Sequence, residues 1–482
     1  MKKLFVLLLM VSLVIVLPAK VKVGEEVVEK FTTAHPYKGG EILEQIFHWP
    51  EAGYIAIHFS QFNLAKGDYV EIANAEGTIS YTYKEKGKSV KGGTEAISEF
   101  WATHIPGDTA VVTLYSKNKN GGFGFEVDKW VHGYPREQIE IAFFKMENGF
   151  EADAGIEAIC GTNDKEWAQC YLGTDMYNNA KAVCRLLMNG SSACTGWLLG
   201  SEGHVMTNEH CIGSQSTADN TDFEFMAEAS CTTNCSSWFA CPGTVVADHG
   251  TVVQLDSALD YTLVMLPTNV SGTYGYLKMR DTLPTINERI YIPQHPSAYG
   301  KQIAVYSTDS HDESGFGEIY TTSATPCSGG PGDIGYYADT EGGSSGSPVI
   351  AFDDNLVVAL HHCALCPNRG VPIPAIIADL GSNIPADAVE GGTPPEPGPP
   401  AAPSNLTGAK DKYSVALSWS DNSNDEDGFK VYKDGGLVAT LGANTTSYEV
   451  TGLTRKVTYT FQVCAFNDLG TACSTTISVR TR

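Results

Sequence analysis

Three short motifs, in one order along the chain, constrain what this sequence can fold into more than any other feature. In chain order they are VMTNEHC (205–211), ALDYTLVML (258–266) and GGSSGSPVI (342–350). A hydroxyl group is a poor nucleophile at neutral pH, so acyl transfer needs an imidazole to accept its proton and a carboxylate to hold that imidazole in the right tautomer. The motifs supply these groups as His210, Asp260 and Ser345, and we predict that the fold brings them together.

The order His, Asp, Ser separates classes of serine hydrolase, because unrelated folds assemble the same geometry in different chain orders. This order favours the chymotrypsin-like double β-barrel. Residues 342–346 also match the G-x-S-x-G turn of α/β-hydrolases, which would make Ser344 the nucleophile. In that class an acid and then a histidine follow the serine at some distance, but the candidates here crowd close behind it: Asp353, Asp354, His361 and His362. We therefore reject the α/β-hydrolase interpretation.

Glycines on both sides of Ser345 indicate a tight turn. Gly343 and Gly346 let the backbone approach a substrate closely, because glycine has no side chain and tolerates unusual dihedral angles. The N–H groups of Gly343 and Ser345 are then expected to form an oxyanion hole, the set of donors that stabilises a tetrahedral intermediate. Ser344 and Ser347 are the alternative nucleophiles. A flexible Gly/Ser loop is the non-catalytic alternative, which the apolar, strand-like stretch that follows disfavours.

Asp260 stands at the head of a strongly apolar strand. A carboxylate is costly to bury there without a hydrogen-bonded partner, and the ring N–H of His210 is the natural partner. Asp256 lies in a more polar approach to the same strand and is the alternative carboxylate. A core histidine bonded to a backbone carbonyl would explain His210 alone, but it would not explain the three motifs together.

On these motifs, residues 193–377 resemble the trypsin-like serine peptidases, in particular the secreted bacterial branch that includes lysyl and glutamyl endopeptidases. The resemblance implies a double six-stranded β-barrel in which Ser345 attacks a peptide bond, His210 shuttles the proton and Asp260 orients the imidazole. It also implies protein or peptide substrates, with neither a metal nor an organic cofactor. A serine esterase and a catalytically inactive binding protein on the same fold are the alternatives.

Two residues are candidates for selecting the side chain before the cleaved bond, the P1 side chain. Asp339 lies six residues before Ser345, where the resemblance places the pocket aspartate of trypsin, and a buried carboxylate there would pair with Lys or Arg. His361 lies on a strand that resembles the one carrying a histidine in both glutamyl and lysyl endopeptidases. We predict cleavage after Lys or Arg. Cleavage after Glu is the alternative, and an ordinary loop carboxylate is the non-functional explanation of Asp339.

The start of the chain and its charge indicate an exported protein. Residues 1–19 combine a charged start, an apolar run and the small residue Ala19, which predicts a secretory signal peptide; an uncleaved anchor is the alternative. The formal net charge is −24. We therefore expect no nucleic acid partner and, after signal cleavage, no membrane partner, because nucleic acids and anionic membranes reward clusters of Lys and Arg.

The chain contains thirteen cysteines, which in an exported protein favour disulfides over zinc sites. The predicted bonds are Cys194–Cys211 beside His210, Cys464–Cys473, one between Cys160 or Cys170 and Cys363 or Cys366, and one that contains Cys241. The odd number leaves one thiol unpaired. Cys184, in an apolar strand-like run, is the candidate, because a free cysteine packs as a small hydrophobe.

Two further domains flank the peptidase-like region, and all are predicted to be mainly β. Short alternating runs separated by turn residues indicate β-sandwiches on either side. The run 55–64 followed by 67–72 resembles a CUB-like module without cysteines, which implies an accessory domain or a removable propiece that would account for any latency. After the linker, Pro403, Trp419 and the Tyr-x-Phe-x-Val run at 459–463 resemble a fibronectin type III domain. Either could contact a protein or polysaccharide surface. The predicted order is signal peptide (1–19), CUB-like sandwich (25–136), peptidase (155–388), Pro/Gly-rich linker (389–402) and fibronectin type III domain (403–482).

Overall fold

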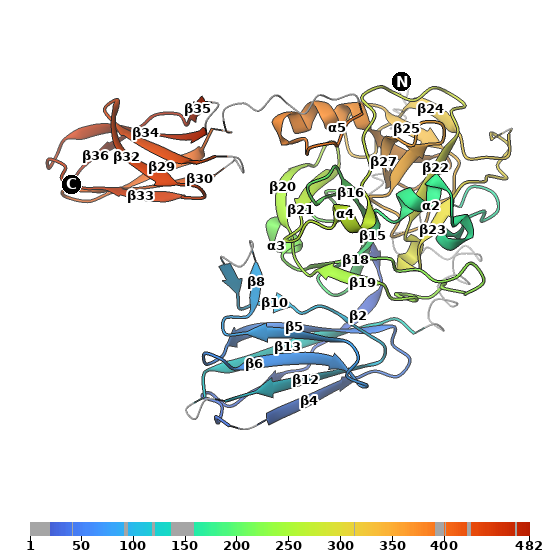
Figure 1. Ribbon diagram of the computed structural model, residues 1–482, viewed down its shortest axis with the longest axis horizontal. Helices are drawn as coiled ribbons and strands as arrows, with labels where there is room; N and C mark the ends of the chain where they lie inside the picture. Colours follow the sequence, from blue (N-terminus) through green and yellow to red (C-terminus); the bar gives the residue numbers. More distant parts are fainter. Residues whose placement is uncertain are drawn as a thin grey trace, which may run out of the picture. The chain divides into compact units, whose positions relative to one another are not determined.

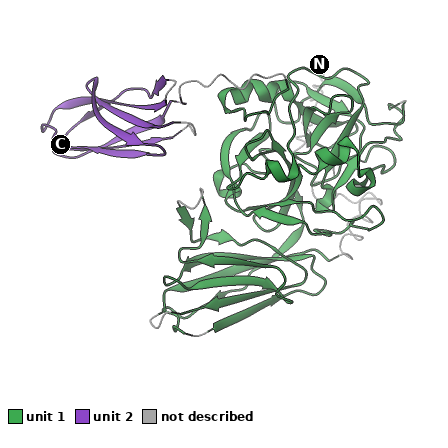
Figure 2. Cartoon of the chain, in the orientation of Figure 1, with its two compact units in different colours: residues 1–390 green, residues 391–482 purple. Residues whose placement is uncertain are grey.

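A computed structural model describes residues 20–40, 42–90, 95–117, 121–135, 159–312, 314–390, 400, 402–421, 426–467 and 470–482. The chain divides into two compact units, Met1–Glu390 and Gly391–Arg482 (Figure 2). The predicted signal peptide and most of the predicted linker lie outside the described residues. The described chain is mainly β, as predicted. None of the helices in its described parts is long and apolar enough to cross a membrane.

Unit 1 begins with a β-sandwich of two antiparallel sheets (Figure 1, blue to cyan). One sheet has the order β10 (Phe100–Trp101), β5 (Tyr54–Asn63), β13 (Gly124–Gly133) and β2 (Gly24–Val27), with β11 (Ile105–Pro106) on β5 and β3 (Phe31–Thr32) on β13. The other has the order β4 (Ile42–His48), β12 (Thr109–Tyr115), β6 (Tyr69–Asn74) and β7 (Ser80–Lys84), and a hairpin joins β8 (Lys88–Val90) to β9 (Glu95–Ile97). Alternate side chains of each strand point inward, and Phe59, Val112 and Trp130 belong to the core.

The rest of unit 1 contains two larger sheets. The first has the order β19 (Thr244–Ala247), β18 (Thr221–Phe225), β15 (Val183–Met188), β16 (Ser192–Leu199), β17 (His204–Thr207), β21 (Tyr261–Met265) and β20 (Thr251–Asp256), with β1 (Val21–Lys22) on β16. The second has the order β14 (Glu166–Trp167), β23 (Gln302–Ala304), β22 (Ile290–Gln294), β26 (Pro348–Ala351), β27 (Val357–Cys363), β28 (Asn368–Pro372), β25 (Asp333–Tyr336) and β24 (Ile319–Ala324). Short helices lie between the strands and after the last of them: η2 (Ala168–Tyr171), α2 (Asp175–Ala180), α3 (Gln215–Ala218), α4 (Ser271–Tyr274), η3 (Pro296–Ala298), α5 (Ile373–Leu380) and η4 (Gly381–Asn383).

These two sheets form the chymotrypsin-like fold that the motif order predicted. Trp197 and Leu263 of the first sheet share one buried cluster with Ile350 and Leu360 of the second, so the sheets pack on a common core. Each sheet contains eight strands, more than the six predicted for each barrel, partly because β1 and β14 add to them from outside the motif-bearing region. The predicted motifs lie on or beside β17, β21 and β26, next to this core.

The N-terminal sandwich packs directly against the first of the two large sheets. A separate apolar cluster contains Tyr54 and Trp101 of the sandwich together with Leu187 and Phe239 of the peptidase-like region. Polar contacts join the same surfaces: Nδ1 of His104 lies 2.7 Å from Oδ2 of Asp222, Tyr54 donates to the Gly190 carbonyl at 3.0 Å, and the Val23 N–H donates to the Ser191 carbonyl at 2.9 Å. The sandwich and the two sheets therefore share one compact unit.

Unit 2 is a β-sandwich of its own. One sheet has the order β29 (Ser404–Lys410), β30 (Val415–Ser420) and β33 (Ser447–Val450). The other has the order β32 (Gly436–Gly442), β31 (Gly428–Lys433), β34 (Thr458–Asn467) and β35 (Gly470–Cys473), with β36 (Ile477–Arg480) on β34. Trp419, Phe429 and Val463 pack in the core between them, where alternate strand residues point inward.

Six disulfides stabilise the described chain. They are Cys160–Cys366, Cys170–Cys231, Cys194–Cys211, Cys235–Cys241, Cys327–Cys363 and Cys464–Cys473. Cys184 is the free cysteine, and burial raises the pKa of its thiol to about 12. Six disulfides indicate an oxidising, extracellular type of compartment. The sequence did not pair Cys170 with Cys231 or Cys327 with Cys363, because disulfide connectivity depends on which strands the fold brings together.

Candidate active site

Two neighbouring strands bring His210 and Asp260 together. Strands β17 and β21 pair antiparallel, with Thr207 opposite Thr262; His210 follows the end of β17, and Asp260 precedes the start of β21. Nδ1 of His210 lies 2.8 Å from Oδ2 and 3.1 Å from Oδ1 of Asp260. The backbone N–H of His210 donates to Oδ1 at 3.0 Å. One carboxylate therefore holds both the ring and the main chain of His210.

The Asp260 carboxylate is buried, and its surroundings keep it ionised. Burial by itself raises the pKa of a carboxyl group, but attraction to His210 and hydrogen bonds from His210 and His362 outweigh it and hold the pKa of Asp260 well below its ordinary range. Asp260 has a positive φ of 45°, a conformation that Asp adopts more readily than most residues. Its carbonyl accepts a hydrogen bond from Nδ2 of Asn208 at 2.8 Å. Backbone and side chain are thus both fixed.

Ser345 lies in the loop between β25 and β26, and main-chain hydrogen bonds fix this loop against β16 of the first sheet and β27 of the second. The Ser345 carbonyl accepts the N–H of Thr195 at 2.9 Å, and the N–H of Gly346 donates to the His361 carbonyl at 2.8 Å. Gly343 and Gly346 have φ values of 97° and 88°. A Cβ atom at Gly346 would lie 2.1 Å from the Thr195 carbonyl oxygen, so the loop requires glycine there.

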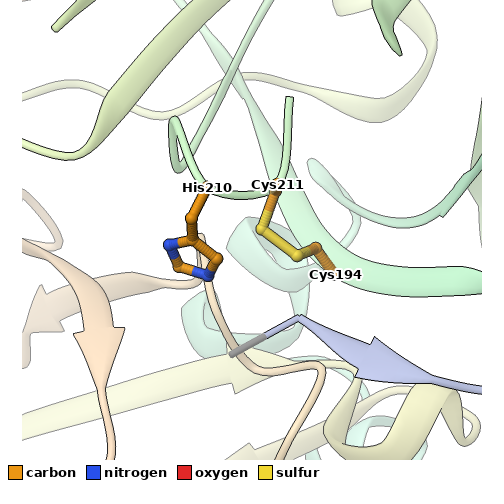
Figure 3. A group of neighbouring side chains, drawn as sticks. All are labelled: Cys194, His210 and Cys211. Atoms are coloured by element: carbon orange, nitrogen blue, oxygen red, sulfur yellow. A yellow bond between two sulfur atoms is a disulfide. The ribbon is translucent and has the colours of Figure 1, made fainter. Parts of the chain in front are cut away.

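A disulfide joins β16 to the segment that carries His210. Figure 3 shows the Cys194–Cys211 bond next to the imidazole ring, and Sγ of Cys211 lies 3.9 Å from the Ser345 carbonyl oxygen. Among the described residues, two groups bring together side chains of metal-binding types: Cys194, His210 and Cys211, and Cys327, Asp333 and His362. In both groups the cysteines belong to disulfides and are not the thiolates that bind metals.

The reactive atoms of the predicted site are covered. Ser345 is fully buried, and the His210 side chain is 10% exposed. Nε2 of His210, the ring atom opposite Asp260, is buried and has no hydrogen-bond partner among the described residues. Buried ring nitrogens are usually hydrogen-bonded. The ring is therefore oriented by Asp260, but in the described chain its Nε2 makes no hydrogen bond to the Ser345 hydroxyl.

The alternative residues considered from the sequence have structural partners. Oγ of Ser344 accepts the N–H of Glu341 at 3.1 Å and donates to Oε1 of Gln294 at 2.5 Å. Oγ of Ser347 donates to the Ser344 carbonyl at 2.5 Å. Oδ1 of Asp256 accepts a backbone N–H of its own turn at 2.7 Å. These contacts hold the two serines in the loop scaffold and Asp256 in its turn.

Asp339 and His361 are the two residues predicted to select the P1 side chain. Both are buried, but their surroundings differ. Oδ1 of Asp339 accepts the N–H of Cys160 at 2.9 Å, and Oδ2 accepts the N–H of Asp164 at 2.7 Å. Burial raises the pKa of Asp339 to about 6. Nδ1 of His361 lies 2.6 Å from the hydroxyl oxygen of Tyr336. Both oxygens of Asp339 thus anchor the segment that precedes the first large sheet.

The structure adds two residues that sequence reasoning missed, His362 and Asp333. Nδ1 of His362 lies 3.2 Å from Oδ2 of Asp260, and Nε2 lies 3.1 Å from Oδ2 of Asp333. Asp333 begins β25 and is distant in sequence from both partners. Neighbouring residues on a strand face opposite sides, so the adjacent histidines 361 and 362 indicated that one of them could face Asp260. Nothing in the sequence identified Asp333.

Comparison with known proteins identifies a domain in each of two parts of the chain. Residues 194–360 match the family model of the trypsin-like peptidase domain, and residues 401–480 match the fibronectin type III domain. Both matches agree with the sequence interpretation of these regions. Among solved structures, Glu endopeptidase is 16% identical, covering 46% of this chain and 96% of its own, with a TM-score of 0.33. Deg5 is 15% identical, covering 43% and 93%, with a TM-score of 0.32.

Among curated proteins, the secreted RxLR effector protein 73 of Plasmopara viticola is 39% identical over 342 residues, which cover 68% of this chain and 79% of the effector. The chain therefore belongs to the same protein family as this effector. Chitinase Chi52 of Paenibacillus xylanexedens is 40% identical over 126 residues, 25% of this chain and 23% of the chitinase.

Proposed function

We propose that this protein is a secreted serine endopeptidase in which Ser345 attacks the peptide carbonyl, His210 takes and returns the proton, and Asp260 orients the imidazole. The observation that carries the proposal is the buried Asp260 carboxylate, which lies 2.8 Å from Nδ1 of His210. An ionised orienting carboxylate keeps the proton on Nδ1, so Nε2 can act as the base.

The chemistry proceeds through an acyl-enzyme. Attack by the Ser345 oxygen forms a tetrahedral intermediate whose oxyanion the N–H groups of Gly343 and Ser345 would stabilise. Support for this role comes from the positive φ of Gly343 and from the Ser297 N–H, which donates to the Gly342 carbonyl at 2.5 Å and so fixes the peptide plane that carries the Gly343 N–H. His210 then protonates the leaving amine, and water, activated by the same imidazole, releases the acyl group.

The decisive experiment is a digest of a denatured protein mixture by the purified chain, beside a Ser345→Ala control, with every new terminus mapped by mass spectrometry. Cleavage only by the unsubstituted chain would support the proposal. Activity on short acyl esters without peptide cleavage would replace it with an esterase. Equal absence of cleavage by both chains, on peptides and on esters alike, would contradict it.

For P1 specificity, the contacts favour His361 over Asp339. Asp339 would have to offer a carboxylate to a substrate Lys or Arg, but both of its oxygens already accept backbone N–H groups. His361 lies on β27, whose main chain bonds to Gly346 beside Ser345. We infer that Asp339 is structural and that an acidic P1 side chain, the alternative weighed from the sequence, suits the site better than a basic one.

The same digest distinguishes these specificities. We expect cuts after Glu that His361→Asn weakens. Cuts after Lys or Arg that Asp339→Asn abolishes would restore the prediction of a basic P1. Each variant serves as the control for the other, because both replace a buried polar group by a neutral one of similar size.

A second candidate is an inactive or latent binding protein on the peptidase fold. The relevant observation is that Ser345 is fully buried, and the relative with broad coverage is described as an effector. A fluorophosphonate probe tests this directly, since it labels a competent serine nucleophile whatever the substrate. Labelling that Ser345→Ala removes would favour the endopeptidase, whereas equal lack of labelling in both chains would favour the binding protein.

A further inference from the structure

A second histidine, His362, contacts the Asp260 carboxylate in addition to His210. His362 lies on β27, and its side chain is fully buried between Asp260 and Asp333, whose side chains are 3% and 2% exposed. Oδ2 of Asp260 therefore receives His210 at 2.8 Å and His362 at 3.2 Å. On the far side, Nε2 of His362 lies 3.1 Å from Oδ2 of Asp333.

Proton counting decides what this geometry means. A neutral imidazole carries one N–H, and its other nitrogen is an acceptor, as is an ionised carboxylate. Both ring nitrogens of His362 face carboxylate oxygens, so both contacts are hydrogen bonds only when the ring carries two protons or when one acid is protonated. His210 holds Asp260 in its ionised form. Oδ2 of Asp333 already accepts the N–H of Cys327 at 3.0 Å, as an ionised carboxylate does. With both acids ionised, the two contacts are hydrogen bonds only if the His362 ring carries two protons.

The charges around His362 favour the same state. Burial lowers the pKa of an imidazole, but the hydrogen bonds that His362 donates to Asp260 and Asp333 outweigh it and raise the pKa of His362 to about 9. Of the neighbouring ionisable groups, His361 on the same strand faces the Tyr336 hydroxyl. Arg369 on β28 donates to the Thr325 carbonyl at 2.8 Å. The two carboxylates are thus the groups bonded to this ring.

We propose that His362 is a positioning residue: an imidazolium that donates one hydrogen bond to Asp260 and the other to Asp333, and so holds the Asp260 carboxylate against His210. This inference rests on the proposed function for its catalytic consequence, but the hydrogen-bonded arrangement does not depend on activity. The group Asp333–His362–Asp260 carries one positive and two negative charges, and the remaining negative charge stabilises protonated His210.

The proposal predicts opposite shifts for two substitutions. Asp333→Asn removes one negative charge and leaves His362 paired with Asp260 alone, so protonated His210 is less stabilised and the acidic limb of the kcat/KM profile moves to lower pH. His362→Gln removes the positive charge beside Asp260. The Asp260 carboxylate then stabilises protonated His210 more strongly, so the acidic limb moves to higher pH. We expect shifts of about one pH unit each, kcat losses of about tenfold and unchanged KM.

A purely structural role would lower activity without moving the limb in opposite directions. The double variant His362→Gln/Asp333→Asn provides the matched control, because it removes both charges and leaves no buried carboxylate unpaired. We expect its acidic limb to lie within about half a pH unit of the unsubstituted chain. Limbs that do not move, or that move in the same direction in both single variants, would overturn the proposal.

A second measurement is independent of catalysis. In the full chain carrying Ser345→Ala, nitrogen NMR should show both ring nitrogens of His362 protonated at pH 7, with the signal assigned by its loss in His362→Gln. Adding Asp333→Asn should move the titration midpoint down by more than about one pH unit. A singly protonated ring at pH 7 overturns the inference even if the enzyme is active. A doubly protonated ring in a chain without activity upholds it while the proposed endopeptidase function fails.

Discussion

At the residue scale, Asp260 and Asp339 are both buried carboxylates, but their partners give them different protonation properties. Asp260 faces two histidines and stays ionised, whereas Asp339 faces two backbone N–H groups, and burial raises its pKa to about 6. The difference follows from the partners, because nearby cations offset desolvation more strongly than dipoles do. The sequence alone did not show this difference between Asp260 and Asp339, because it does not reveal their partners.

Replacing Asp260 tests this assignment. We expect Asp260→Asn to lower kcat by about 10⁴-fold, since an amide no longer holds His210 in the tautomer that leaves Nε2 free to accept a proton. Asp256→Asn is the matched control, because Asp256 caps its own turn and should retain most of the activity. The measurement is initial rate on the best peptide found in the digest. Equal losses in the two variants would contradict the role of Asp260.

The pKa of His362 also predicts a pH dependence of stability. The folded-state pKa is raised to about 9 from about 6.5 in an unfolded chain. This histidine therefore contributes stability that is fully present below about pH 6.5 and lost as pH rises through about 9, about 3 kcal/mol in all. Thermal unfolding of the full chain between pH 6 and pH 9 should show the loss. His362→Gln should flatten the curve in that window, and an unchanged slope would argue against a buried cation.

At the element scale, the loop between β25 and β26 is shaped by its contacts with β16 and β27. Thr195 of β16 donates its N–H to the Ser345 carbonyl, and its carbonyl approaches Gly346 so closely that no side chain fits. The loop conformation is thus imposed by a strand far away in sequence, and the glycines record that constraint.

A methyl group at Gly346 tests the constraint. Gly346→Ala should destabilise unit 1 by more than about 3 kcal/mol and abolish activity, since the added Cβ meets a backbone oxygen in addition to an unfavourable φ. Gly275→Ala is the control: its φ is 79° and its Cβ would meet nothing within 4 Å, so we expect a cost of about 1 kcal/mol. Denaturant titration of both variants provides the comparison. Similar losses would show that the close approach does not matter.

At the scale of the whole molecule, the N-terminal sandwich and the peptidase-like sheets share buried surface, whereas Gly391–Arg482 forms its own unit. Deleting residues 20–135 would expose Leu187 and Phe239 and leave Asp222 without His104, at a cost of more than about 5 kcal/mol. A chain shortened in this way should aggregate or unfold, as measured by near-ultraviolet circular dichroism and limited proteolysis.

Deleting residues 403–482 is the matched truncation. Because this segment lies in the second compact unit, we expect the remaining chain to fold and to keep its peptide cleavage within about twofold. If the chain without residues 20–135 instead stays folded and cleaves faster, the sandwich is the removable propiece that the sequence allowed.

The sequence by itself determined the fold class, the two recognisable domains and the tight turn around Ser345, because these depend on local patterns: strand alternation, glycine spacing and the order of the His210, Asp260 and Ser345 motifs. Only the tertiary structure decided what surrounds them. The partner of His362, the anchoring contacts of Asp339, the pairing of Cys327 with Cys363 and the union of the sandwich with the peptidase-like sheets all join segments far apart in the chain. A pattern within one segment carries no information about which distant strand will pack against it, so these contacts follow from the packing of the whole core.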